Sequence, residues 1–192
     1  MNLLDTLLAY NRTFVADRGY EPFKTDKFPD KNFAILTCMD TRLVELLPKA
    51  MGLKNGDVKL IKNAGALITH PWGSVMRSLI VAIYQLRANE VCVIAHHDCG
   101  MGSINPREVL NNVVARGINP KAIETLQAAG IDLDGWLKGF HDVEESVRHT
   151  VNLIKTHPLI VPDIPIHGLV IDPNTGALTV VVDGNQKQEK AE

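Results

Sequence analysis

Long hydrophobic runs, an excess of basic charge and a secretion signal are all missing from this sequence. No stretch approaches the roughly 18 uninterrupted apolar residues of a transmembrane span. The first residues are apolar but include Asp5 and lack a basic start, which is not typical of a signal peptide. With 20 Lys and Arg against 22 Asp and Glu, and no long basic run, neither nucleic acid nor a membrane is an expected partner. We therefore expect a cytoplasmic protein.

Cysteine is also scarce, with Cys38, Cys92 and Cys99 as the only three in the sequence. An odd number in a reducing compartment indicates metal binding or catalysis more often than disulfide pairing. Cys92 lies inside an expected buried strand, and we interpret it as a thiol of the core. The segments around Cys38 and Cys99 are therefore the candidates for chemistry.

The sequence has enough apolar residues for one folded domain, since 45% of its 192 residues are hydrophobic. We assign residues 1–192 to a single domain. Four leucines between positions 3 and 8 predict an amphipathic N-terminal helical arm over residues 1–30, which needs an apolar surface of its own or of a partner subunit to cover it. The polar residues 184–192 are expected to form a disordered tail.

Short apolar runs alternate with helical periodicities along the rest of the chain. Strands are predicted at 33–38, 58–61 and 91–95, helices at 73–89, 106–115, 120–129 and 142–156, and a β-hairpin at 166–171 and 177–182. This alternation predicts an α/β fold with a central, mostly parallel β-sheet, an antiparallel edge strand and helices on both sides.

Reactive side chains concentrate at the ends of two predicted strands. The segment CMDTR (38–42) follows the first strand, and HHDCG (96–100) follows the third. Ligands in open parallel sheets lie at the carboxyl ends of the strands, so we expect the two segments to converge. Two thiolates and one imidazole suit tetrahedral Zn²⁺ and leave a fourth position for water, as in catalytic zinc sites. The sequence therefore predicts one zinc ion per chain.

Cys38, His96 and Cys99 are the expected zinc ligands. His97 is the alternative histidine, because adjacent strand residues face opposite ways and only one can reach the ion. The spacing to Cys99 favours His96, and we interpret His97 as a surface or packed residue. Zinc lowers the pKa of its bound water, but two thiolates cancel the formal charge of the ion and weaken this effect. Hydration activity should therefore rise on the alkaline side.

Asp40 and Arg42 are the expected catalytic residues. Asp40 follows Cys38 by two positions, so it can accept a hydrogen bond from zinc-bound water or ligate the metal itself. A bidentate pair with Arg42 would hold the carboxylate off the zinc and keep it ionised. Asp98, in the second segment, is expected to accept hydrogen bonds from backbone amides of the turn that carries Cys99.

Taken together, Cys-x-Asp-x-Arg at 38–42, His-x-x-Cys-Gly at 96–100 and Lys-Asn-Ala-Gly at 62–65 resemble the β-class carbonic anhydrases. The resemblance covers residues 33–102. It implies zinc on Cys38, His96 and Cys99, and reversible hydration of CO₂ to bicarbonate and a proton by zinc-bound hydroxide. It also implies an Asp40 and Arg42 dyad, with a closed state in which Asp40 leaves Arg42 and becomes the fourth ligand. A homodimer or dimer of dimers with exchanged N-terminal helices is implied as well.

Some positions depart from the family pattern. Lys62 stands where many members have Arg, and His97 where Thr or Ser is usual. Ile35 and Thr37 stand where the bicarbonate-regulated subgroup has Trp and Gly, which argues against the allosteric bicarbonate pocket of that subgroup. The metal ligands match the pattern.

Two other functions fit the same residues. One is hydrolysis of a CO₂ analogue, carbonyl sulfide or carbon disulfide, at the same site. The other is a zinc-containing oligomer without catalysis, in which Asp40 closes the metal. A cysteine phosphatase is disfavoured, because Arg42 follows Cys38 by four positions instead of the six of a Cys-x₅-Arg loop, and Asp40 would repel an anionic substrate.

Overall fold

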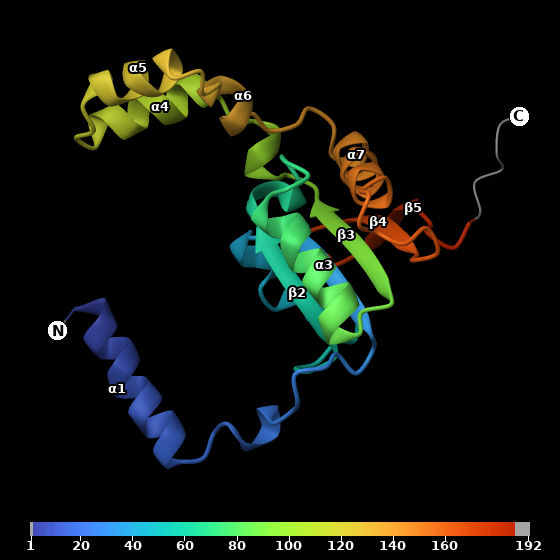
Figure 1. Cartoon of the computed structure of the whole chain (residues 1–192). Helices are drawn as coiled ribbons and strands as arrows, with labels where there is room; N and C mark the ends of the chain where they lie inside the picture. Colours follow the sequence, from blue (N-terminus) through green and yellow to red (C-terminus); the bar gives the residue numbers. More distant parts are fainter. Residues whose placement is uncertain (1, 187–192) are drawn as a thin grey trace, which may run out of the picture.

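A computed structural model describes residues 2–186 as a five-stranded β-sheet with helices on both faces (Figure 1). The strands, in chain order, are β1 (Phe33–Cys38), β2 (Val58–Asn63), β3 (Glu90–His96), β4 (Ile166–Ile171) and β5 (Leu178–Val182). Their order across the sheet is β2-β1-β3-β4-β5, parallel except for the antiparallel edge strand β5. The predicted α/β fold is therefore confirmed.

The chain changes direction across the sheet between β1 and β3. It passes from β1 to β2 on one side and then crosses back, so that β3 pairs with the other side of β1. In open α/β sheets such a switch point opens a crevice at the carboxyl ends of the two strands. Cys38 and His96 are the last residues of β1 and β3, so the topology places them at this crevice.

The helices, in chain order, are α1 (Leu3–Ala16), α2 (Leu46–Ala50), α3 (Ser74–Leu86), α4 (Pro106–Ala115), α5 (Pro120–Ala128), α6 (Leu133–Leu137) and α7 (Val143–Lys155). Short 3₁₀ turns lie at η1 (Glu21–Phe23), η2 (Thr41–Leu43), η3 (Ala64–Ala66) and η4 (Gly100–Gly102). The predicted helix over 73–89 ends earlier than expected because Arg87 adopts a left-handed φ of 63°. The sequence did not predict the five-residue helices α2 and α6.

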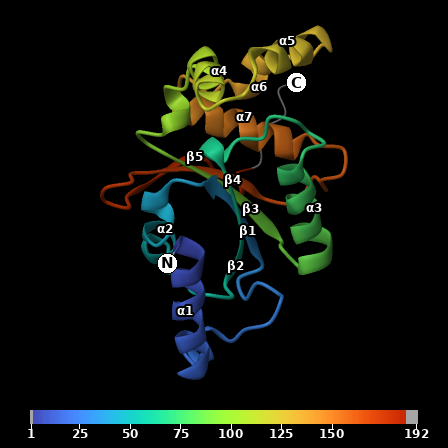
Figure 2. The same ribbon diagram turned by 90° about the vertical axis from the view of Figure 1, so that its left-hand side faces the viewer.

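Alternate residues of the central strands build two separate cores. Leu36 and Val93 belong to the core on the face covered by α3 and α7. On the opposite face Ile35 and Ile94 belong to a cluster with Leu43 and other residues of the η2 and α2 segment. Figure 2 shows α3 and α2 on opposite sides of the sheet. The period of two along each strand produces this division.

The first helix and the α4–α5 pair extend away from the sheet (Figure 1). None of the residues in α1, α4 or α5 is buried in this chain. The leucines at positions 3, 4, 7 and 8 are 47–75% exposed. The expected helical arm is thus present as a helix, and its apolar side has no cover from its own subunit among the described residues.

The expected disordered tail, 184–192, falls mostly outside the described residues, which end at 186. At its start the backbone N–H of Gly184 donates to His167 Nδ1 at 3.1 Å. The described part of the chain contains no helix long and apolar enough to cross a membrane.

Gly168 lies where α7 packs on β4. A Cβ atom at this position would lie 2.5 Å from Val147 Cγ1 and 3.1 Å from Val151 Cγ2. We expect Gly168→Ala to lower the free energy of unfolding by about 1–3 kcal/mol through over-packing, measured by urea denaturation. Gly102→Ala is the control, since its nearest contact would be an ordinary 3.4 Å. Equal losses in the two variants would contradict this reading of the α7 contact.

Candidate metal centre

Three potential metal ligands meet at the crevice between β1 and β3. Cys38 ends β1, His96 ends β3, and Cys99 follows in the turn before η4. The donor atoms of the three side chains all lie within 4.8 Å of one another. The Sγ atoms of Cys38 and Cys99 are 3.9 Å apart. The structure therefore brings together side chains that are 61 positions apart in the sequence.

The geometry suits a tetrahedral ion. Two sulfurs bound at about 2.3 Å to such an ion would be about 3.8 Å apart, close to the separation in this structure. His96 Nδ1 lies 2.8 Å from the carbonyl oxygen of His97, which fixes the proton on Nδ1 and leaves the lone pair on Nε2. His96 Nε2 is buried and has no hydrogen-bond partner among the described residues. A buried nitrogen without a partner is costly, and a metal ion would satisfy it.

The polypeptide also stabilises charge on one of the sulfurs. The backbone N–H of Gly65 donates to Cys38 Sγ at 3.3 Å. Gly65 has a φ of 81°, where glycine is favoured, and a Cβ there would lie 3.1 Å from Met101. Burial alone would raise the pKa of Cys38, but its contacts with His96, Gly65 and Asp40 lower it to about 7. The thiol of Cys38 therefore loses its proton near neutral pH.

Cys99 differs from Cys38 in its ionisation. Burial is the main cause that raises the pKa of Cys99, to about 11, and the neighbouring Cys38 adds to the shift. Two adjacent thiolates repel each other, so the second proton leaves readily only when a cation occupies the space between them. A Cys-His-Cys donor set of this kind could hold a soft or borderline divalent ion.

Asp40 and Arg42 form a bidentate pair beside the three ligands. Arg42 Nε donates to Asp40 Oδ1 at 3.0 Å, and Nη2 donates to Oδ2 at 2.9 Å. The hydrogen bonds from Arg42 are the largest cause that lowers the pKa of Asp40, to about 2. Asp40 Oδ2 lies 3.7 Å from His96 Nε2, the nitrogen that faces the two sulfurs. An ionised carboxylate therefore stands next to the donor set.

Asp98 does not have the contacts expected from the sequence. It was predicted to cap backbone amides of its own turn, but its Oδ2 accepts from Arg42 Nη1 at 2.9 Å. In the same turn the N–H of Gly102 donates to the Cys99 carbonyl at 2.9 Å. Asp98 has a left-handed φ of 54°, and its carboxylate is bound across the crevice. The opposite charges of Arg42 and Asp98 in the two converging motifs were the signal for this contact.

The remaining residues singled out from the sequence lie outside the donor set. His97 is exposed and is held by a backbone hydrogen bond to Ile171 at 3.1 Å. Cys92 is 1% exposed in the core, and burial raises the pKa of its thiol. Thr37 is buried, and its hydroxyl donates to the carbonyl oxygen of Ile94 at 2.8 Å. None of these side chains belongs to the Cys-His-Cys cluster.

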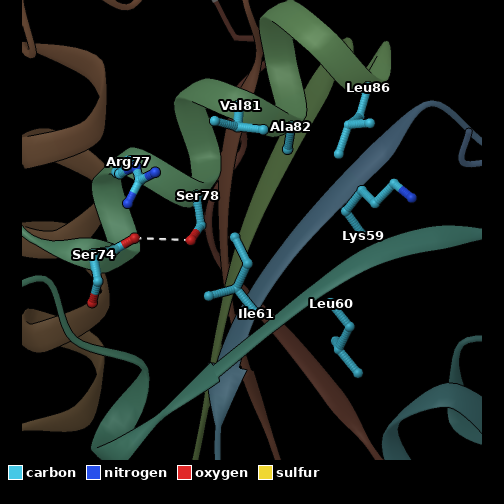
Figure 3. A pocket seen from close by; sticks show the side chains of 9 residues that line it. All are labelled: Lys59, Leu60, Ile61, Ser74, Arg77, Ser78, Val81, Ala82 and Leu86. Carbon is cyan, nitrogen blue, oxygen red and sulfur yellow. Dashed lines mark hydrogen bonds between the residues drawn. The ribbon is translucent and has the colours of Figure 1, made fainter. Parts of the chain in front are cut away.

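A separate cavity of about 410 Å³ lies between α3 and the edge strand β2 (Figure 3). Its lining includes Lys59 and Arg77, and Ser78 Oγ donates to the carbonyl oxygen of Ser74 at 2.8 Å. No residue of the candidate metal centre lines this cavity. Within this chain it is therefore not part of the site at the strand ends.

Comparisons with known proteins agree on one family. The carbonic anhydrase family model matches residues 33–178. The Bacillus subtilis protein YtiB, provisionally named a carbonic anhydrase, is 58% identical over 184 residues, which cover 96% of this chain and 98% of that protein. The crystal structure of β-carbonic anhydrase isoform I from Trichomonas vaginalis has a TM-score of 0.87 at 34% identity and covers 96% of this chain and 100% of its own. A carbon disulfide hydrolase from Acidianus is 29% identical over 156 residues, 75% of this chain and 74% of that protein.

Proposed function

The chain belongs to the β-carbonic anhydrase family, and from this premise we propose that it catalyses the reversible hydration of CO₂ to bicarbonate and a proton. One zinc ion per chain would be held by Cys38, His96 and Cys99. The observation that carries the proposal is the buried, unpartnered His96 Nε2 beside two sulfurs that are 3.9 Å apart. Location in the cytoplasm stays a prediction from the sequence.

Zinc, when bound, would supply the Lewis acidity that makes hydroxide available near neutral pH. Asp40 would orient the attacking water, since its Oδ2 is the carboxylate oxygen nearest the donor set and can accept a hydrogen bond there. A carboxyl group with a pKa of about 2 is a weak base at neutral pH, so Asp40 serves to orient the water and not to remove its proton. Arg42 would keep Asp40 ionised and in place.

The two alternative functions have less support. Among the solved structures, a carbon disulfide hydrolase has a TM-score of 0.67 at 24% identity, whereas the β-carbonic anhydrase from Trichomonas vaginalis has a TM-score of 0.87 at 34% identity. A zinc oligomer without catalysis would need Asp40 on the metal, but both oxygens of Asp40 are bound by Arg42. Hydration of CO₂ is therefore the function that we propose.

Stopped-flow CO₂ hydration on protein of known zinc content, measured from pH 6 to pH 9, tests this function. Because two thiolates cancel the formal charge of Zn²⁺ and weaken its Lewis acidity, we expect kcat to rise towards alkaline pH. Titration of Asp40 does not change the rate between pH 6 and pH 9, since Arg42 lowers its pKa to about 2. Zinc-loaded protein that hydrolyses carbon disulfide but does not hydrate CO₂ would favour the alternative substrate. A flat pH profile would contradict the expected rise of activity on the alkaline side.

We also propose that the chain forms a homodimer or a dimer of dimers in which the N-terminal helices are exchanged. The four leucines of α1 are exposed in the single chain, and burial of each would contribute about 1.5–3 kcal/mol. We expect the combined Leu3→Ser, Leu4→Ser, Leu7→Ser and Leu8→Ser variant to have a smaller mass by light scattering. The matched control Thr13→Ser should keep the native mass. An unchanged mass in the leucine variant would show that α1 does not join the subunits.

A further inference from the structure

The guanidinium of Arg42 is bound from two sides. Nε and Nη2 donate to Asp40 on one side, and on the other side Nη1 donates to Asp98 Oδ2 and Nη2 to the carbonyl oxygen of Asp98, each at 2.9 Å. All three guanidinium nitrogens therefore have an acceptor. The two partners belong to different segments, one after β1 and one after β3.

The hydrogen bonds from Arg42 to Asp98 connect two different chain segments, whereas those from Arg42 to Asp40 lie within one segment. Asp40 and Arg42 are two positions apart in one turn, so their pair cannot tie that turn to another. Among the side-chain hydrogen bonds of the described residues, those from Arg42 to Asp98 and the contact between the two sulfurs are what join 38–42 to 96–100. Asp98 therefore provides a cross-link between the two turns that carry Cys38 and Cys99, outside the donor set itself.

This cross-link fixes the positions of side chains but contributes little to the free energy of unfolding. The side chain of Asp98 is 84% exposed and that of Arg42 is 36% exposed, and ion pairs in contact with water contribute little to folding. A guanidinium is planar and rigid, however, so fixing its Nη1 edge also fixes the Nε and Nη2 edge that holds Asp40. Through Arg42, Asp98 thus helps to fix the position of Asp40 and of the two turns that carry Cys38 and Cys99.

We propose that Asp98 is a positioning residue that clamps Arg42 across the crevice, and so fixes Asp40 and the turns of Cys38 and Cys99 relative to one another. This role rests on the proposed function, since it takes the Cys-His-Cys cluster as the zinc site. The left-handed φ of 54° at Asp98 belongs to this arrangement. In this backbone conformation the carboxylate and the carbonyl oxygen of Asp98 both accept hydrogen bonds from Arg42. Asp, Asn and Gly tolerate that conformation best.

The rate at which a chelator removes zinc from the purified protein tests the clamp without reference to catalysis. We expect Asp98→Gly, which is compatible with the left-handed backbone, to accelerate zinc loss about 10- to 100-fold, the range in which losing a group that orients metal ligands changes metal affinity. Asp98→Asn keeps an oxygen acceptor and should give an intermediate rate. In an Arg42→Ala background the Asp98→Gly change should alter zinc loss less than about twofold, because the contact it removes is already absent.

Two results would overturn the clamp. One is native zinc loss in both Asp98 variants. The other is equal acceleration with and without Arg42, which would mean that glycine only loosens its own turn. Asp163→Asn is the control, as it removes an exposed carboxylate far from the site in the sequence and should leave the rate unchanged. Circular dichroism of each variant checks folding. A zinc-loaded protein that shows the coupling but does not hydrate CO₂ would refute the proposed function and leave the clamp intact.

Discussion

Replacing Cys38 with serine is expected to remove the metal and to lower CO₂ hydration at least about a thousandfold, because the metal supplies most of the acceleration. A serine hydroxyl stays protonated at neutral pH and is a poor ligand for a borderline-soft ion. His96 and Cys99 would remain as the only two ligands. The hydrogen bond from Gly65, which now stabilises negative charge on Cys38 Sγ, would have no anion to stabilise. Zinc content and stopped-flow rates on the same sample measure both effects.

Cys92 offers a matched control for this change. Cys92→Ser makes the same substitution in the same core cluster, but the thiol of Cys92 is not part of the donor set. We expect Cys92→Ser to keep a full zinc content and a near-native rate, and to lose about 1–3 kcal/mol of stability from the buried hydroxyl. Full zinc and full activity in Cys38→Ser would show that the ligand assignment is wrong.

The sheet could be predicted from the sequence to within a few residues, whereas its strand order could not. Runs such as 33–38 and 91–95 are apolar, short and bounded by polar residues, so their extent is a local property. The order of the strands in the sheet depends on where each crossover helix packs, and no local sequence pattern encodes that. The helices α2 and α6 are five residues long, too short for a helical period to appear.

The meeting of the two motifs was predictable because a parallel sheet aligns the carboxyl ends of its strands. That rule alone predicts that Cys38 lies near His96 and Cys99. The role of Asp98 was not predictable in the same way. Its contact with Arg42 depends on a left-handed backbone angle at Asp98, which is a property of the folded turn.

Arg42→Ala should have the opposite signature to Cys38→Ser, with full zinc at purification and a rate reduced about 100- to 1000-fold, the loss typical of removing one preorganised polar group. All three ligands remain, so the metal is retained. Asp40 loses both guanidinium bonds, and its pKa returns from about 2 towards the ordinary value for an aspartate. Its Oδ2 lies 3.7 Å from His96 Nε2, so the released carboxylate would be free to compete with water for the ion that the three ligands would hold.

The Arg42→Lys variant distinguishes the effect of the positive charge of Arg42 from the effect of its planar shape. Lysine keeps the positive charge but cannot bond Asp40 and Asp98 with one rigid fork, so its rate should lie between those of Arg42→Ala and the native protein. Arg116→Ala removes an exposed arginine from the end of α4 and should leave the rate unchanged. An Arg42→Ala variant with native kcat would mean that Asp40 needs no partner to stay off the metal.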